Sequence, residues 1–278
     1  MERKKIKAFL ALMIVAGFLV LIYPSVSNRW NEYRMERLTG EYDTSVQAID
    51  DTEKTALFEA AAKYNRTLVG SAVPDVFATR DEVRDPLYES LLNPAGSGMM
   101  GQVEVPVIGV KLPVYHYTTE DVLEQGAGHL PGSSLPVGGK GTHVVISAHR
   151  GLPRAKLFTD LDRLKKGDMF YLYILGKTFA YEVDRTKVVE PQNTKDLAIE
   201  EGKEYCTLLT CTPYGVNTQR LLVRGHRVPY SDARYLAESG SKSGPGAESV
   251  LMRLLCVLIG IIAAFSVVWL WRKKFQRK

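Results

Sequence analysis

The stretch that most limits the possible folds is a pair of β-forming runs joined by a turn, within residues 204–225. Residues 205–210 are rich in β-forming side chains and lead into Cys211, and residues 219–223 form a second such run. Between them, residues 212–217 read Thr-Pro-Tyr-Gly-Val-Asn, which is typical of a turn. The pattern predicts a β-hairpin that holds Cys211 and Arg220 near one another at its open end.

Cys211 is the first candidate for chemistry, because a cation next to a thiol favours the nucleophilic thiolate. The competing interpretation is a small buried hydrophobic residue, the usual state of a lone cysteine. A disulfide with Cys206 is excluded by distance, since five residues of strand span about 16 Å. The third cysteine, Cys256, lies in an apolar run near the C-terminus. No disulfide framework is therefore predicted.

Further short β-forming runs precede the hairpin, without a regular alternation of strands and helices. The predicted strands are residues 101–107, 112–116, 144–147, 168–175 and 177–190, followed by the two runs of the hairpin. Pro106 favours an edge position for the first of them. Helical spacing is found at 119–125, with Thr118 or Thr119 as cap, and at 156–164. We predict a mainly β fold, closed into a barrel over residues 99–230.

Two apolar runs flank this region. Residues 8–23 follow four basic residues, and residues 254–271 precede five. A membrane-spanning helix needs about 20 apolar residues, and flanking lysines extend the reach of a shorter run. Because basic residues favour the cytoplasmic side, we predict two transmembrane helices, both termini cytoplasmic, and residues 28–249 outside the cell membrane. A cleaved signal peptide ending near Ser25-Val26-Ser27 is the alternative for the first run.

These runs divide the chain into five parts. Residues 1–27 form a cytoplasmic tail and anchor, and residues 28–98 form a helical arm, with Asp43 or Thr44 as helix cap, and an irregular segment. After the barrel, residues 231–249 are rich in Gly, Ser and Ala and predict a linker, and residues 250–278 form the second transmembrane helix and a basic cytoplasmic tail.

Charge is distributed unevenly along the chain. The total is +5, yet the basic excess lies in the two ends, so the region between the anchors is net acidic. Nucleic acid is therefore not a predicted partner. No cofactor is predicted either. A metal site is not predicted, since Asp160, Asp162 and Asp168 lack the spacing of a calcium loop.

Two motifs resemble those of a known family. Thr207-Leu208-Leu209-Thr210-Cys211 is similar to the Thr-Leu-x-Thr-Cys signature of sortases, and Arg220 stands nine residues on, where sortases carry their catalytic arginine. Ser147-Ala148-His149-Arg150-Gly151-Leu152-Pro153 is similar to the segment that bears the family's histidine. His-Arg-Gly-Leu-Pro and Cys-Thr-Pro-Tyr-Gly-x-Asn together resemble class C sortases, the pilin polymerases of Gram-positive bacteria.

The resemblance implies an eight-stranded barrel and three catalytic residues. Cys211 would be the nucleophile, His149 the proton donor and acceptor, and Arg220 the support of the oxyanion, with Thr210 as a further support. Among five histidines the motif selects His149; the others are His116, His129, His143 and His226. His143 starts the strand that leads to His149. Arg224 lies on the same strand face as Arg220 by parity and is the alternative arginine.

The implied activity is that of a membrane-anchored cysteine transpeptidase. It would cleave a Leu-Pro-x-Thr-Gly-type sorting signal between Thr and Gly, hold the acyl group as a thioester, and transfer it to a pilin lysine. One alternative is a housekeeping sortase that attaches proteins to a cell-wall precursor; two anchors and the long segment before the barrel speak against it. Another is a non-catalytic surface scaffold, which would not need Cys211, His149 and Arg220 together.

The irregular residues 68–98 resemble the segment in which class C sortases carry a lid over the active site, marked by an Asp-Pro-aromatic motif. Asp75 and Phe77 keep the acid and the aromatic ring, with Val76 between them. Asp85-Pro86 keeps the Asp-Pro pair and reaches an aromatic ring only at Tyr88. We favour Asp75 and Phe77, because residues 88–93 resemble the family's segment leading into the barrel.

Overall fold

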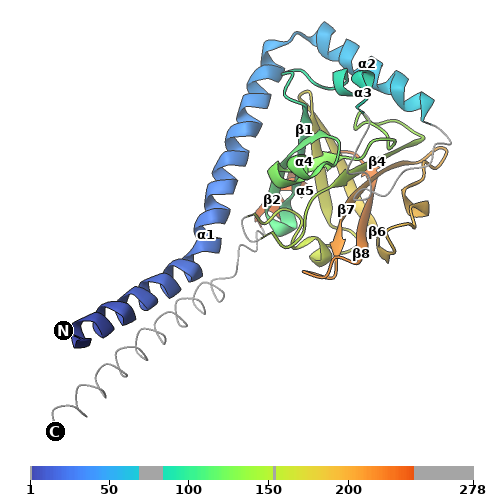
Figure 1. Ribbon diagram of the computed structural model, residues 1–278. Helices are drawn as coiled ribbons and strands as arrows, with labels where there is room; N and C mark the ends of the chain where they lie inside the picture. Colours follow the sequence, from blue (N-terminus) through green and yellow to red (C-terminus); the bar gives the residue numbers. More distant parts are fainter. Residues whose placement is uncertain (1, 69–83, 153–154, 241–278) are drawn as a thin grey trace. The chain divides into compact units, whose positions relative to one another are not determined.

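The computed structural model describes residues 2–68, 84–152 and 155–240. The chain from Trp30 to Lys242 forms one compact unit, and Met1–Arg29 belongs to a separate one. The compact unit contains a closed barrel of eight strands, as predicted (Figure 1).

The barrel strands follow the order β1-β2-β3-β4-β7-β8-β6-β5 around the closed sheet. Their bounds are β1 (Met99–Val105), β2 (Val110–His116), β3 (Ala127–His129), β4 (Thr142–Ser147), β5 (Met169–Ile174), β6 (Lys177–Val189), β7 (Glu204–Thr212) and β8 (Gln219–Val228). Two neighbouring pairs, β2–β3 and β4–β7, are parallel, and the others are antiparallel.

Side chains along each strand alternate between two clusters of buried apolar residues. On β7, Cys206 and Leu208 belong to the main core cluster, whereas Leu209 belongs to a smaller cluster with Val145 of β4 and Leu222 of β8. Successive side chains of a strand point to opposite faces of a sheet, so the main cluster fills the barrel and the smaller one lies on its outer face. Each face therefore has its own set of buried residues.

The predicted edge position of Pro106 was wrong. Strand β1 pairs with β2 on one side and with β5 on the other, so it has no free edge. Pro106 instead follows the strand and starts the 3-10 turn η1 (Pro106–Ile108), where its missing N–H is tolerated. The sequence pattern could not show that the sheet closes on this strand.

Short helical elements fill the connections between strands. Helix α4 (Glu120–Gln125) begins after Thr119, in agreement with the predicted helix and cap position. Residues 156–164 were predicted to be helical; within them the structure has turns and the 3-10 element η2 (Leu161–Arg163). The apolar spacing there reflects burial of Leu157, Phe158 and Leu161 in the core rather than an α-helix. A third such element, η3 (Lys195–Leu197), lies between β6 and β7.

The boundary between the first two helices differs from the predicted one. Helix α1 (Glu2–Ala48) runs through Asp43 and Thr44, and helix α2 (Asp51–Thr67) is capped by Asp50, whose side chain accepts a hydrogen bond from Glu53 N at 2.8 Å. Asp43 is not a cap because its carboxylate accepts from Gln102 Nε2 of β1 at 2.8 Å. The Thr44 hydroxyl donates to Gly40 O within the helix.

The C-terminal part of α1 is fixed to the barrel by buried hydrogen bonds. Tyr42 donates from its hydroxyl to Met100 O at 2.9 Å and accepts from Leu175 N at 3.1 Å. Burial raises the pKa of Tyr42 to about 12, so the phenol stays protonated and able to donate. The buried Gln102 of β1 has its partner on the same helix, because its Nε2 donates to Asp43.

One helical stretch of the described chain, Met13–Ala48, is long and apolar enough to cross a membrane. It overlaps the predicted first anchor. The predicted second anchor, residues 250–278, lies outside the described residues. The segment predicted as a linker, residues 231–249, starts with helix α5 (Asp232–Gly240), which is attached to the barrel by Arg234 to Glu182 and by Tyr235 to Glu104. Its residues from 241 onward are not described.

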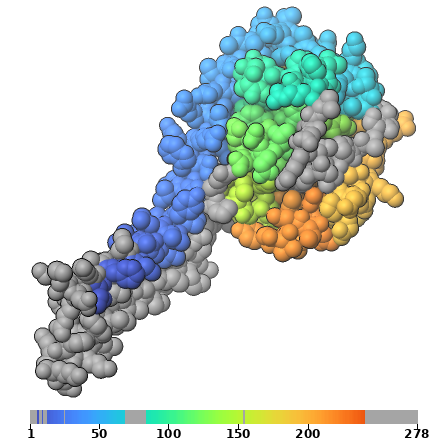
Figure 2. All heavy atoms as spheres, in the orientation of Figure 1, coloured from blue at the N-terminus to red at the C-terminus, as the bar shows by residue number. Residues whose placement is uncertain are grey.

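Helix α2 and the short helix α3 (Pro86–Ser90) lie next to each other at one end of the barrel (Figures 1 and 2). Asn65 of α2 is buried and bonds the backbone of Leu135 twice. Its Nδ2 donates to Leu135 O at 3.0 Å, and its Oδ1 accepts from Leu135 N at 2.7 Å. One side chain thus satisfies both polar backbone groups of the buried residue Leu135.

We expect Asn65→Ala to lower the free energy of unfolding by about 2 kcal/mol or more, because it leaves two buried backbone groups without partners. The measurement is chemical denaturation followed by circular dichroism. Lys63→Ala, an exposed change on the same helix, is the control and should shift stability by less than about 0.5 kcal/mol. Equal effects of the two variants would contradict the role assigned to Asn65.

Candidate active site

The parallel pairing of β4 with β7 brings His149 and Cys211 to the same edge of the barrel. Ser147 pairs with Leu209, and the next residue, Ala148, donates from its N to Leu209 O at 3.2 Å. Because the two strands run in the same direction, the residues that follow them emerge side by side. His149 and Cys211 are each two residues beyond the Ser147–Leu209 pair.

Arg220 lies at the same edge of the barrel, on strand β8, which neighbours β7 on the side away from β4. Cys211 and Arg220 are directly paired across the antiparallel β7–β8 hairpin, as predicted, but they lie next to its turn and not at its open end. Both are mostly buried, with 7% and 8% of their surface exposed. Arg220 Nη1 contacts Asn217 O at 3.4 Å and Gln219 O at 3.3 Å, which holds the guanidinium at the strand end. His149, Cys211 and Arg220 thus come from three adjacent strands, in the order β4, β7, β8.

Thr210 is fully buried, and its hydroxyl donates to Ala148 O at 2.7 Å. This bond ties the residue before His149 to the residue before Cys211. The structure therefore gives the Thr210 side chain a positioning contact between the two strand ends. Its predicted part in supporting the oxyanion stays a prediction.

Arg150 connects the loop of His149 to two other segments. Its Nη1 donates to Thr212 Oγ1 at 3.1 Å, and its Nη2 is paired with Asp162 of η2. The neighbouring Gly151 has a φ of +81°, and a Cβ there would lie 3.0 Å from the Tyr214 ring. A side chain at position 151 would be strained and crowded. The histidine loop is therefore held closely against the turn that follows Cys211.

His149 also faces the start of helix α4. Its Nε2 lies 3.4 Å from Glu120 Oε1. The His149 side chain is 16% exposed and that of Glu120 is 62% exposed, so the carboxylate is open to solvent while the imidazole is largely covered. His149 O accepts from Phe158 N at 3.1 Å, which fixes the backbone of the loop.

A small pocket lies beside Arg220 on the outer face of the barrel. Besides Arg220, it is lined by apolar residues of the outer cluster, Val189, Leu197, Leu209 and Leu222, and by polar residues of the β6–β7 connection. Strand pairing puts this pocket on the β8 and β6 side of Cys211.

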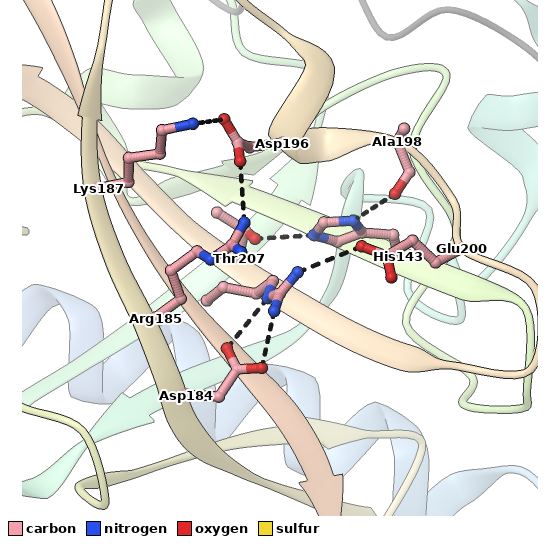
Figure 3. Close-up of polar contacts among 9 residues, drawn as sticks. His143, Asp184, Arg185, Lys187, Asp196, Ala198, Glu200 and Thr207 are labelled. Carbon is pink, nitrogen blue, oxygen red and sulfur yellow. Dashed lines mark hydrogen bonds and ion pairs between the residues drawn. The ribbon is translucent and has the colours of Figure 1, made fainter.

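The alternative candidates His143 and Arg224 have other contacts. His143 is buried between Ala198 and Thr207 (Figure 3), with Nδ1 2.9 Å from Ala198 O and Nε2 2.7 Å from Thr207 Oγ1. Burial lowers its pKa, which favours the neutral ring that such a donor and acceptor pair needs. His143 thus ties the β6–β7 connection to the sheet.

Arg224 pairs with Thr207 in the sheet, four residues before the position of Cys211. Its guanidinium forms a two-point bond with Asp184, at 3.0 and 2.9 Å, and its Nη1 lies 3.3 Å from Glu200. Nearby, Asp196 bridges Arg185 and Lys187 (Figure 3). The Arg224 side chain therefore belongs to a structural network, away from the end of β7 where Cys211 lies.

The remaining candidates differ in how far the structure describes them. His129 is fully buried and bonded to Tyr88 and Ser134, and burial lowers its pKa to about 4. Asp75 and Phe77 lie outside the described residues, so the lid stays a prediction. In the alternative motif, Asp85 caps helix α3 by accepting from Leu87 N at 2.9 Å, and Pro86 is its first residue.

Sequence reasoning did not find Arg150, Glu120 and the pocket residues as parts of the site. Arg150 lies inside the quoted histidine motif, yet its partners are 62 and 12 residues away along the chain. Glu120 looks like an ordinary acidic residue in the first turn of a helix. Only the tertiary arrangement reveals their neighbours.

Comparisons with known proteins agree with this geometry. A family model of the sortase domain matches residues 103–228. The structure is similar to sortase C of Streptococcus pneumoniae (43% identity, TM-score 0.64, covering 70% of this chain and 98% of that one). It is also similar to sortase C1 of Streptococcus agalactiae (44% identity, TM-score 0.65, covering 70% and 100%). Sortase D of Bacillus subtilis is 28% identical over 65% of this chain and 87% of its own length.

The barrel and the site thus define a transpeptidase of the sortase type, and the chain belongs to the sortase family. Its structural neighbours at 40–45% identity are class C sortases, which confirms the class inferred from the motifs.

The contacts of Arg150 lead to a prediction about positioning. Arg150→Ala should lower the transpeptidase rate about tenfold, because the histidine loop loses its bonds to Thr212 and Asp162. The measurement is the cleavage rate of a sorting-signal peptide, with circular dichroism to confirm folding. Asp162→Asn, which weakens one of the two contacts, should give a smaller loss in the same direction, and the exposed Lys166→Ala should give none. An unchanged rate in Arg150→Ala would refute the positioning role.

Proposed function

We propose that this chain is a membrane-anchored cysteine transpeptidase that joins pilin subunits. The observation that carries the proposal is the convergence of His149, Cys211 and Arg220 at one edge of a class C sortase barrel. The pneumococcal sortase C structure is described as giving insight into pilin substrate specificity, and a related one of group B Streptococcus is called pilus-related. Class C sortases act on pilins that carry sorting signals.

In the proposed reaction, the Cys211 thiolate attacks the carbonyl carbon between Thr and Gly of a Leu-Pro-x-Thr-Gly-type signal. Negative charge develops on the carbonyl oxygen, and the Arg220 guanidinium, which does not lose its proton, stabilises it. His149 gives a proton to the departing amine, and a thioester remains on Cys211. The amine of a pilin lysine then attacks the thioester and releases Cys211.

The outer face beside Arg220 is the proposed place for the acyl half of the sorting signal. The apolar residues around the small pocket would contact the Leu and Pro side chains there, next to Cys211 on the β8 side. The predicted lid at Asp75 and Phe77 would cover the thioester and keep water away from it. The helical stretch Met13–Ala48 supports a membrane anchor. The outward orientation of the barrel follows from the basic residues before it.

The alternatives fit less well. A housekeeping sortase that attaches proteins to a cell-wall precursor would share the three catalytic groups, yet the neighbours at 40–45% identity are class C enzymes. A non-catalytic scaffold would have no use for a mostly buried cysteine paired with a mostly buried arginine.

Replacement of the nucleophile tests the proposal directly. We expect Cys211→Ala to abolish cleavage of the sorting signal and formation of covalent pilin ladders, while the barrel stays folded. Ladders are followed by denaturing gel electrophoresis, and the fold by circular dichroism. Cys206→Ala is the matched control, because Cys206 faces the barrel interior, where burial raises the pKa of its thiol well above the usual value. Ladders formed by purified Cys211→Ala would refute the mechanism.

The two arginines of β8 should respond oppositely to the same substitution. Arg220→Lys keeps the charge but loses the planar fork, and we expect a fall in kcat of about 100-fold. Arg224→Lys should keep most of the activity and instead lower stability by about 1 kcal/mol or more, since Lys cannot replace the two-point bond to Asp184. Peptide cleavage kinetics and chemical denaturation separate the two effects. Activity lost in Arg224→Lys and kept in Arg220→Lys would reverse the assignment.

A further inference from the structure

The three catalytic groups divide the surface around Cys211 into two sides. Arg220 and the apolar pocket lie on the β8 side, whereas His149 lies on the β4 side. Once the acyl group is bound to Cys211 and its chain occupies the β8 side, the second substrate must approach the thioester from elsewhere. The β4 side also carries His149, the group that must take a proton from the incoming amine.

Helix α4 borders this second side. The helix connects β2 to β3, and β3 pairs with β4 at Gly128 and Ser147, two residues before His149. The first residue of α4, Glu120, places Oε1 3.4 Å from His149 Nε2. Its side chain is 62% exposed, so a partner from solvent can reach the carboxylate without moving the protein.

We propose that Glu120 binds the ammonium group of the acceptor lysine and delivers it to His149; the inference rests on the proposed function above. A lysine amine has a pKa of about 10.4 in water and arrives charged. A carboxylate next to the general base gives that ammonium group a charge-assisted hydrogen bond at the point where its proton must leave. Glu120 is thus a specificity residue for a cationic acceptor rather than for the sorting signal.

The lysine ammonium gives one proton to the neutral imidazole of His149 and becomes an amine. The amine attacks the thioester carbonyl, a C–N bond forms, and the C–S bond breaks to release the Cys211 thiolate. The second proton that leaves the nitrogen goes to solvent. Glu120 stays ionised throughout and forms no covalent bond, and the cycle ends with imidazolium and thiolate, ready for the next sorting signal.

The test compares two nucleophiles on the same thioester. The full-length enzyme in detergent is given a Leu-Pro-x-Thr-Gly peptide and either Nα-acetyl-lysine amide, which is cationic, or hydroxylamine, which is uncharged at neutral pH. We expect Glu120→Gln to reduce kcat/KM for the lysine compound about three- to tenfold more than for hydroxylamine. Any effect of Glu120 on thioester formation through His149 cancels in this ratio.

Asp121→Asn is the matched control, because it removes the same charge from the next, also exposed, residue of α4. It should leave the ratio of the two nucleophiles unchanged. Glu120→Lys should lower the ratio further than Glu120→Gln. An equal loss with both nucleophiles would show that Glu120 acts only on His149 and would overturn the proposal, as would unchanged kcat/KM values with both. If the wild-type enzyme forms no hydroxamate, the proposed function itself fails, which is a separate outcome.

Discussion

The parallel register between β4 and β7 is the constraint on which the site depends. It pairs Ser147 with Leu209 and continues through the bonds of Ala148 to Leu209 and of Thr210 to Ala148. A slip of one residue would turn the Cys211 side chain from the outer face into the barrel and shift it relative to His149. The buried bond between His143 and Thr207 resists such a slip further down the same strand pair. Register, rather than any single loop, sets the catalytic geometry.

A polar network on the outer face supports the other half of the site. The β6–β7 connection lines the pocket beside Arg220, and it is held by His143 to Ala198, by Arg224 to Glu200 and by Asp196 to β6. The charged side chains of Arg224 and Asp184 are largely buried and pair with each other. The pairing matters because a buried charge without a partner is unfavourable. The network gives a long connection a defined shape next to the nucleophile, which a purely apolar contact would specify less well.

The sequence was informative where a property depends on neighbours along the chain. The β7–β8 hairpin, with Cys211 opposite Arg220, and helix α4 followed from local pattern and turn residues. The Asp43 cap, the edge strand at Pro106 and the helix at 156–164 were wrong because distant contacts decided them. Asp43 bonds Gln102, 59 residues away, and strand β1 gains a second partner only when the barrel closes on β5. The motif selected His149 among five histidines, but no pattern indicated Glu120 or the partners of Arg150.

The two cysteines of β7 show how strand parity assigns chemistry. Cys206 and Cys211 are an odd number of residues apart, so their side chains point to opposite faces of the strand. Cys206 faces the main core, where burial raises its pKa and keeps the thiol protonated and inert. Cys211 faces outward at the strand end, directly opposite the Arg220 guanidinium. The same residue type on one strand therefore packs in the core at one position and lies beside Arg220 at the other, where we propose that it acts as the nucleophile.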